Sequence, residues 1–404
     1  MRVLWLTNQT FENRNKSSVY NGGGWIDSLK CALLNFSIVP HDLSIGIVAF
    51  GDLDYHELDS DGINHYCIER IKAYLFNYKH KENIFLEKLL SVVNDFSPDV
   101  IHVFGSEKEW GLISTLTDIP IVLHIQGILT PYYEAWLPQN MTWSRFIFQN
   151  KKQWIIRHNL RKFVAREQRI FRNTHSYMGR TDWDFYIAKL MSPECNYYYC
   201  SEMLRPVIYN SSKIWQYHER ENKRIISIIS NSPYKGSDIV LRTAKILKLY
   251  MKNKFEWHVY GINDISFGER VTGIKANEVN VFIHGIISAD NLVEVIANGD
   301  IYCHPSYIEN SPNTVCEAQL LGIPVVTTNG GGTSSLINNS EDGVLVNTND
   351  VYYTASVIKD LLTDKEKSVR IGKNGRQTAL KRHNPETIVN DLVKIYKRVS
   401  KKCF

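Results

Sequence analysis

No apolar run in this sequence reaches the roughly 20 residues that a helix needs to cross a bilayer. The first residues, MRVLWLTNQTFENRN, form a short apolar run that polar residues follow at once. We therefore expect a buried first strand there and no secretion signal. Any contact with a membrane would then be peripheral.

Cysteine is also too sparse to organise the fold. The chain has seven cysteines, an odd number scattered from Cys31 to Cys403. They form no disulfide framework, and Cys195 with Cys200 lacks zinc-finger spacing and a second pair. We expect a reducing, cytoplasmic location, with the inner face of the membrane as the surface that the protein could meet.

Charge of one sign is not in large excess. The formal net charge is +5 over 404 residues, which hints at an acidic partner or a membrane surface and does not require nucleic acid. The G-x-G-x-x-G pattern of dinucleotide-binding proteins is missing as well, so nicotinamide binding is not expected.

The length instead predicts two domains, because 404 residues exceed what one core usually serves. Strand-like runs alternate with helical segments throughout, which predicts doubly wound α/β domains with parallel sheets. We expect a first domain over 1–205, a linker over 206–224 where apolar residues become few, a second domain over 225–385 and a final helix over 386–404.

The most informative stretch runs from Glu309 to Glu317. It lies between the strand-like runs Ile301–His304 and Ile323–Thr328. We expect Ser311 to cap a helix that has Pro312 at its first position and ends at Gly322. Such a helix start presents unpaired N–H groups, here near Asn313 and Thr314, where a phosphate would sit. Glu309 and Glu317 could then accept hydrogen bonds from sugar hydroxyls, which suggests a sugar nucleotide, although two glutamates at this spacing alone are more often a solvated helix face.

Seven residues separate Glu309 from Glu317, and Ala318 and the run GIPVV follow. This pattern resembles the E-x7-E signature of the retaining glycosyltransferases of family 4. That family has the GT-B fold of the glycogen phosphorylase and glycosyltransferase superfamily. The resemblance implies two Rossmann-like domains that face each other across a cleft, with a C-terminal helix that crosses back to the first domain. It implies that Glu309 contacts the donor sugar near the reacting carbon and that Glu317 holds the ribose.

The resemblance assigns further residues of the first domain. Gly23 and Gly24, in a turn before a helix, would line the cleft beside donor phosphate or acceptor; a plain flexible turn is the alternative. His124, near the end of a strand-like run, would hydrogen-bond near the reacting sugar carbon, although a lone strand histidine is more often a core residue.

In the second domain, the resemblance implies that the lysine of a Lys-Gly pair, here Lys235, binds the diphosphate. It also implies that the backbone near Ile286 reads the base. The family often has an arginine after the preceding strand, where this chain has Ser230 and Asn231. Arg180 and Arg205 are candidates to support the phosphate in its place. For Arg180, an ion pair with Asp182 or Asp184 is the alternative.

Residues 143–173 carry many lysines and arginines, with Glu167 as the single acidic residue and apolar residues at helical spacing. Such a basic amphipathic helix could lie on anionic lipid and approach a lipid-linked acceptor. It could equally pack on the first sheet with a solvated basic face. The aromatic residues of TPYYEAW, residues 130–136, could stack on sugars or simply pack.

The resemblance implies a metal-independent hexosyltransferase that moves a sugar from a nucleoside diphosphate to a saccharide or lipid-linked hydroxyl with retention, in surface polysaccharide or glycolipid synthesis. The sugar nucleotide is a substrate, so no cofactor is expected, and no Asp-x-Asp follows a strand to hold a metal. Two alternatives stay open: another GT-B enzyme, such as an epimerase or phosphorylase, and a non-catalytic carbohydrate-binding protein.

Overall fold

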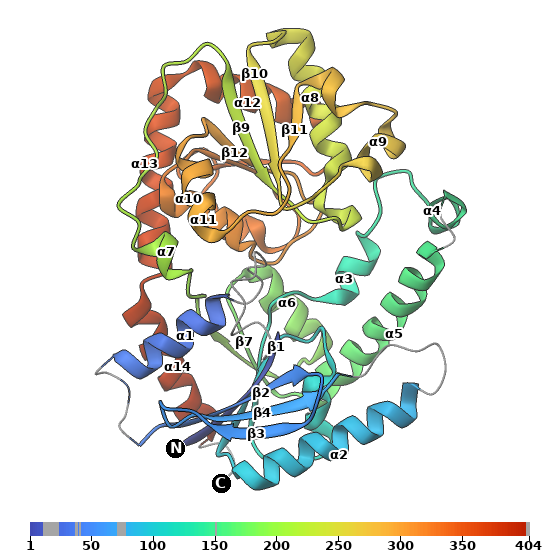
Figure 1. Cartoon of the computed structure of the whole chain (residues 1–404), viewed down its shortest axis with the longest axis vertical. Coiled ribbons are helices and arrows are strands. Elements are labelled where there is room, and N and C mark those ends of the chain that lie inside the picture. Colours follow the sequence, from blue (N-terminus) through green and yellow to red (C-terminus); the bar gives the residue numbers. More distant parts are fainter. Residues whose placement is uncertain (11–23, 37–38, 40–41, 71–77, 150–151, 401–404) are drawn as a thin grey trace.

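The computed structural model describes residues 1–10, 24–36, 39, 42–70, 78–149 and 152–400, which form two α/β domains arranged along the long axis of the molecule (Figure 1). The first is built on an eight-stranded sheet and the second on a six-stranded sheet. This is the GT-B architecture that the sequence predicts.

The first sheet has the strand order β3-β4-β2-β1-β5-β6-β7-β8. Its strands are β1 (Arg2–Thr10), β2 (Ser44–Gly51), β3 (Tyr55–Leu58), β4 (Asn64–Glu69), β5 (Val100–Phe104), β6 (Ile121–His124), β7 (Ser176–Gly179) and β8 (Asn196–Tyr199). Its helices are α1 (Gly24–Asn35), α2 (Tyr78–Phe96), η2 (Glu109–Thr115), α3 (Leu129–Glu134), α4 (Trp143–Gln149), α5 (Lys152–Asn173) and α6 (Asp182–Met191).

The expectation of a wholly parallel first sheet is wrong at one edge. β3 pairs with β4 antiparallel, and neither strand was expected from the sequence. All four residues of β3 are exposed, so this strand lacks the buried apolar face that makes a strand recognisable. The remaining strand pairs of this sheet are parallel.

The second sheet is parallel throughout and has the order β11-β10-β9-β12-β13-β14. Its strands are β9 (Lys223–Ile228), β10 (Phe255–Tyr260), β11 (Val281–Ile283), β12 (Ile301–His304), β13 (Val325–Thr328) and β14 (Val344–Val346). Its helices are η3 (Pro233–Lys235), α8 (Ser237–Met251), α9 (Ser266–Thr272), η4 (Ala276–Val279), α10 (Ala289–Ala297), α11 (Asn313–Leu321), η5 (Gly332–Ser335), α12 (Val351–Thr363) and α13 (Lys365–Arg382). The winding reverses between β9 and β12, and ligands of such sheets bind beyond the carboxyl ends of the strands at this point.

The last helix, α14 (Pro385–Ser400), crosses back to the first domain as predicted and lies beside α1 (Figure 1). Its apolar face, including Leu392 and Tyr396, is buried in one core with Val3 and Trp5 of β1. The Tyr396 hydroxyl oxygen also accepts a hydrogen bond from the indole N–H of Trp5 at 2.9 Å. The C-terminus therefore stabilises the core of the N-terminal domain.

The chain between β8 and β9 contains the short helix α7 (Pro206–Tyr209) and then runs along the second domain. Trp215 is buried there, and its backbone N–H donates to the carbonyl of Leu321 at 2.8 Å. Within the described ranges, no helix combines the length and the apolar character needed to cross a membrane.

Candidate functional site

An ion pair between Glu309 and Lys235 lies where the winding of the second sheet reverses. Lys235 is the last residue of η3, after β9, and Glu309 lies in the loop after β12. Because these two parallel strands are neighbours, the loops after them meet at one edge of the sheet. The ammonium group of Lys235 donates to Oε1 of Glu309, so two residues 74 positions apart in sequence form one charged unit.

Two residues that the sequence analysis missed hold the carboxylate of Glu309 in place. Nε2 of His304 lies 3.4 Å from Oε1 of Glu309, and the hydroxyl of Ser306 donates to the same oxygen at 3.1 Å. Both residues belong to the run CHPS, at and just after the carboxyl end of β12. Their position at the end of a parallel strand was the sequence signal that could have identified them. Burial alone would raise the pKa of Glu309, but Lys235 and His304 outweigh it and hold the pKa at about 2. The group is thus a carboxylate at neutral pH.

Helix α11 begins one residue later than the sequence predicts. Ser311 does not cap it; Pro312 occupies the N-cap position and Asn313 is the first helical residue. The side chain of proline has no acceptor for the first N–H groups of the helix. The first backbone bonds of the helix are those that Val315 and Cys316 donate to the carbonyl of Pro312. The N–H groups of Asn313 and Thr314 lie before these bonds. The C-terminal prediction is confirmed, since Gly322 ends the helix with φ of 86°.

Glu317, in the second turn of α11, is bound by Arg205 from the segment before α7. Nε and Nη2 of Arg205 donate to the two carboxylate oxygens at 2.8 and 2.7 Å. Burial raises the pKa of Glu317, and Arg205 opposes that rise. The stem of Arg205 also lies against Gly24 at the start of α1, where a Cβ would be 3.4 Å from it. Arg205 therefore contacts both Gly24 and Glu317. Gly23 lies outside the described residues.

His124 ends β6 and is buried inside the first domain. Its ring meets that of Trp25 edge-on at 5.5 Å and lies 5.4 Å from that of His102. Neither ring nitrogen has a hydrogen-bond partner among the residues that the structure describes. Burial, with His102 and Arg180 nearby, holds the pKa of His124 well below its usual range, so the ring is neutral.

Arg180 follows β7 and pairs with Glu202 at 2.8 Å. It also donates to the carbonyl of Ile125 at 3.2 Å and to Oε1 of Gln126 at 3.2 Å. The guanidinium group therefore pairs with neither of the aspartates that the sequence offered as an alternative. Ile286 follows β11, the edge strand of the second sheet, and is 48% exposed.

Asn310, next to Glu309, connects the two domains. Its backbone N–H donates to the hydroxyl oxygen of Tyr132, and its side-chain amide donates to the carbonyl of Gln126 at 3.2 Å. The hydroxyl of Thr181 donates to its Oδ1 at 2.7 Å. Nothing in the sequence marked Asn310, because its partners lie more than 120 residues away in the other domain.

Aromatic rings from both domains surround the Lys235 side of this contact. The ring of Tyr234 lies 5.3 Å from that of Tyr132 and 5.1 Å from that of Trp136, and the ammonium group of Lys235 lies 5.3 Å from the centre of the Tyr234 ring. The rings of Tyr132 and Trp136 both come from TPYYEAW, so this segment packs at the domain boundary beside the charged pair.

The basic segment 143–173 forms two helices, α4 and α5. The inner side of α5 is fixed to the first domain: Glu167 accepts hydrogen bonds from the backbone N–H groups of Leu129 and Thr130 and from the hydroxyl of Ser106. Phe148 is 93% exposed and Trp154 is half exposed, so the outer side carries both apolar and basic groups.

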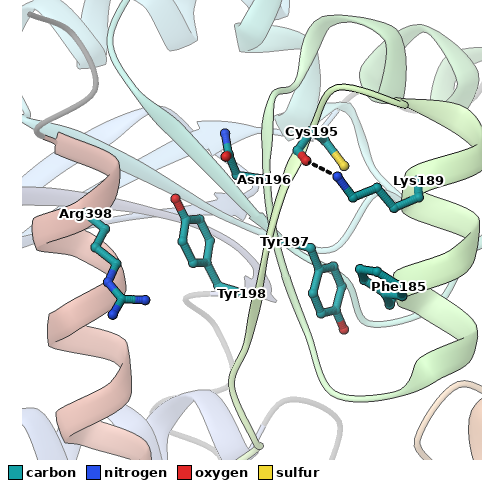
Figure 2. A pocket seen from close by; sticks show the side chains of 7 residues that line it. All are labelled: Phe185, Lys189, Cys195, Asn196, Tyr197, Tyr198 and Arg398. Atoms are coloured by element: carbon teal, nitrogen blue, oxygen red, sulfur yellow. Dashed lines mark hydrogen bonds between the residues drawn. The ribbon is translucent and has the colours of Figure 1, made fainter.

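A surface pocket of about 520 Å³ lies away from these residues, at the free edge of the first sheet beside β8 (Figure 2). Figure 2 shows Tyr197 and Phe185 on one side of the strand and Tyr198 with Arg398 of α14 on the other. None of the residues predicted to form the site lines it. Among the described residues, no group of three histidine, cysteine, aspartate or glutamate side chains is placed to hold a metal ion.

Residues 211–378 match the family model "Glycosyl transferases group 1". The chain resembles a sucrose-phosphate synthase from Thermosynechococcus elongatus over 99% of both chains, with a TM-score of 0.72 and 14% sequence identity. The structural likeness establishes the GT-B fold, and the two findings together support the GT-B glycosyltransferase superfamily.

The sequence is also similar to several known proteins, and two of them are described here. One is the N,N'-diacetylbacillosaminyl-diphospho-undecaprenol alpha-1,3-N-acetylgalactosaminyltransferase of Campylobacter jejuni, 31% identical over 30% of this chain and 31% of that protein. The other is a sulfoquinovosyl transferase of Arabidopsis thaliana, 24% identical over 72% of this chain and 55% of that protein. The chain thus matches about a third of the length of the first and about half of the second.

Proposed function

We propose that this GT-B protein is a glycosyltransferase that moves a sugar from a nucleoside diphosphate to an acceptor hydroxyl and retains the configuration at the anomeric carbon. The observation that carries the proposal is the Glu309–Lys235 ion pair beside the start of α11. A carboxylate, an ammonium group and free helical N–H groups at one point suit a ligand that has both hydroxyls and a diphosphate.

The diphosphate would bind Lys235 and the N–H groups of Asn313 and Thr314. Arg205, which is bound to Glu317, would add a further positive charge nearby. As the bond between the anomeric carbon and the phosphate oxygen breaks, negative charge grows on the diphosphate, and these fixed positive groups stabilise it. They can take the part that a divalent cation plays elsewhere, so we propose that the reaction needs no metal.

Glu309 would orient the donor sugar and stabilise positive charge on its ring, since its pKa of about 2 keeps it ionised. His304 and Ser306 fix the carboxylate, and His124 would contribute a neutral ring near the reacting carbon. The acceptor attacks from the face that the diphosphate leaves, and the departing phosphate oxygen takes the acceptor proton. Glu317, oriented by Arg205, would accept hydrogen bonds from the ribose, while the backbone near Ile286 would read the base.

We further propose a role in polysaccharide or glycolipid synthesis, with a saccharide or lipid-linked acceptor. The undecaprenol-linked substrate in the name of the Campylobacter relative supports this choice. The exposed apolar and basic outer side of α4 and α5 would contact anionic lipid. Flotation with phosphatidylglycerol vesicles, but not phosphatidylcholine vesicles, tests this contact, and Phe148→Ser should weaken it.

Thermal-shift measurements with UDP-, GDP- and ADP-sugars test the donor, because a ligand at 100 times its dissociation constant adds roughly 2.7 kcal/mol of stability. The donor that binds is then incubated with and without acceptor alcohols, and proton NMR identifies the anomer formed. An α-linked donor should give an α-linked product. An isomerised donor would instead indicate an epimerase. A sugar 1-phosphate, formed in a parallel incubation with inorganic phosphate, would indicate a phosphorylase. No turnover of any donor would indicate a binding protein.

A further inference from the structure

Several buried polar atoms at the carboxyl ends of β1, β5 and β6 have no hydrogen-bond partner within the part of the chain that the structure describes. They include Oε2 of Glu107, Nε2 of Gln126 and Oδ1 of Asn8. Buried polar atoms in folded proteins are nearly always paired, so such a group calls for an explanation. None of the three residues has a role in donor binding above.

The backbone at Gly105 brings two of these side chains together. Gly105 has φ of 91°, and a Cβ there would lie 2.0 Å from Oε2 of Glu107 and 3.5 Å from Cγ of Gln126. The other oxygen of Glu107 accepts the backbone N–H of Gly127 at 2.9 Å. Oε1 of Gln126 accepts from Arg180 at 3.2 Å. Glu107 and Gln126 are therefore each held through their Oε1 atom. The unpaired atoms, Oε2 of Glu107 and Nε2 of Gln126, are fixed in place as a result.

This pair lies on the first-domain side of the contact with the donor residues. A Cβ on Gly127 would lie within 3.5 Å of both Glu107 and the ring of Tyr132. The hydroxyl of Tyr132 binds the backbone of Asn310, the neighbour of Glu309, and the carbonyl of Gln126 binds the amide of Asn310. Gln126 thus contacts the neighbour of Glu309 directly, and Glu107 lies close to Tyr132, which contacts the same neighbour.

Burial raises the pKa of Glu107 to about 7, against the hydrogen bond from Gly127. The carboxyl therefore changes charge near neutral pH. The titratable and charged groups that surround it are Lys108 beside it, Glu167 and Arg166 of α5, Tyr132 of α3 and Tyr234 of η3.

We propose that Glu107 and Gln126 bind neighbouring hydroxyls of the acceptor, which makes the acceptor unit a saccharide and not a simple lipid alcohol. Oε2 of Glu107 accepts a hydrogen bond from one hydroxyl, and Nε2 of Gln126 donates to the oxygen of the next. A sugar ring can offer two adjacent hydroxyls to these two atoms while a further hydroxyl reacts, whereas a simple alcohol has only the hydroxyl that reacts. The inference rests on the proposed function and adds the acceptor side of that site.

The test compares the wild type with Glu107→Gln and Gln126→Ala. Glu107→Gln keeps an oxygen for the Gly127 N–H and removes the charge; Glu87→Gln, at an exposed carboxylate of α2, is the matched control. Transfer from the donor that the thermal-shift screen identifies is measured to octyl glucoside, octyl galactoside, octyl N-acetylglucosaminide and n-octanol. Hydrolysis of the same donor without acceptor is measured in parallel.

We expect both variants to lose roughly tenfold to a hundredfold in kcat/KM for an octyl glycoside, mainly through KM. Donor hydrolysis and the donor thermal shift should stay within about twofold of the wild type, as in Glu87→Gln. Between pH 6 and 8, the acceptor KM of the wild type should fall as Glu107 ionises, and that of Glu107→Gln should be flat.

The inference is overturned by unchanged glycoside transfer in both variants, by an equal loss of donor hydrolysis, or by a wild type that uses n-octanol as well as or better than any glycoside. A wild type that hydrolyses its donor but transfers to no glycoside also contradicts it. A wild type that neither hydrolyses nor transfers from any donor refutes the proposed function first, and the inference falls with it.

Discussion

Asn310 donates its backbone N–H to the hydroxyl oxygen of Tyr132 at 2.8 Å, across the boundary between the two domains. Both groups are buried. The residue that follows Glu309 is therefore fixed to the first domain, and we propose that the spacing of the donor and acceptor sides depends on this contact. Five predictions test this arrangement and the charges around it.

Tyr132→Phe removes the acceptor of this bond and leaves a buried N–H without a partner, which costs about 1–3 kcal/mol. We expect the free energy of unfolding to fall by that amount in urea titrations. Tyr186→Phe, at a ring that is 69% exposed, is the control and should change little. Equal stability of the two variants would show that the contact does not hold the domains.

Gly331→Ala should displace Glu309. Gly331 has φ of 74°, and a Cβ there would lie 2.2 Å from the carbonyl oxygen of Glu309. Gly273→Ala shares the positive φ, at 69°, but its Cβ meets nothing within 4 Å. We expect Gly273→Ala to lose roughly 1–2 kcal/mol of stability from backbone strain. We expect Gly331→Ala to lose more stability than this, and only Gly331→Ala to lose sugar transfer as well. Full activity in Gly331→Ala would contradict the placement of Glu309.

Lys235→Met leaves the charge of Glu309 buried without its partner, which typically costs about 3–5 kcal/mol. The double variant Lys235→Met with Glu309→Gln carries neither charge and should be more stable than Lys235→Met alone. A double-mutant cycle of unfolding free energies measures the coupling, and additive effects would show that the pair does not interact.

Glu317→Ala and Lys235→Ala should affect different steps. The first removes the proposed ribose contact and should mainly raise the dissociation constant of the nucleotide, measured by calorimetry. The second removes charge from the leaving diphosphate and should mainly lower kcat. If both variants turn over the donor as fast as the wild type, the roles are wrong.

The buried carboxyl group of Glu202 should make the free energy of unfolding depend on pH. Burial raises its pKa from 4.5 to about 6, against the effect of Arg180. The folded protein holds this proton more tightly than the unfolded chain, so stability is lost as pH rises from 4.5 through 6. The loss is about 2 kcal/mol in total. The stability of Glu202→Gln relative to the wild type should therefore increase by that amount between pH 4 and 7, and a constant difference would refute the shift.

Regular elements of this fold could be predicted because their apolar residues recur with a clear period. Val100–Phe104 and Ile301–His304 are strands as predicted, and the position of Glu309 follows from the strand that precedes it. The exposed strand β3 has no such pattern and was missed. Pro312 was expected inside α11 because proline suits a first helical turn, but the helix begins one residue after it.

Partners of the site residues could not be predicted, because they come from distant parts of the chain. Arg205 was expected near phosphate, yet its two bonds go to Glu317, 112 residues away. Asn310 and Glu107 carry no local motif, and only the meeting of the two domains gives them a role. The sequence could therefore indicate that Glu309 and Glu317 lie in one βα unit, β12 and α11, but not which groups face them.

A crystal structure with the nucleoside diphosphate of the preferred donor tests the central claim most directly. The account predicts the terminal phosphate within hydrogen-bond distance of Lys235 and of the N–H groups of Asn313 or Thr314, and the ribose hydroxyls on Glu317. A nucleotide bound elsewhere, for example in the pocket beside β8, or a diphosphate with no contact to Lys235 or α11, would contradict it.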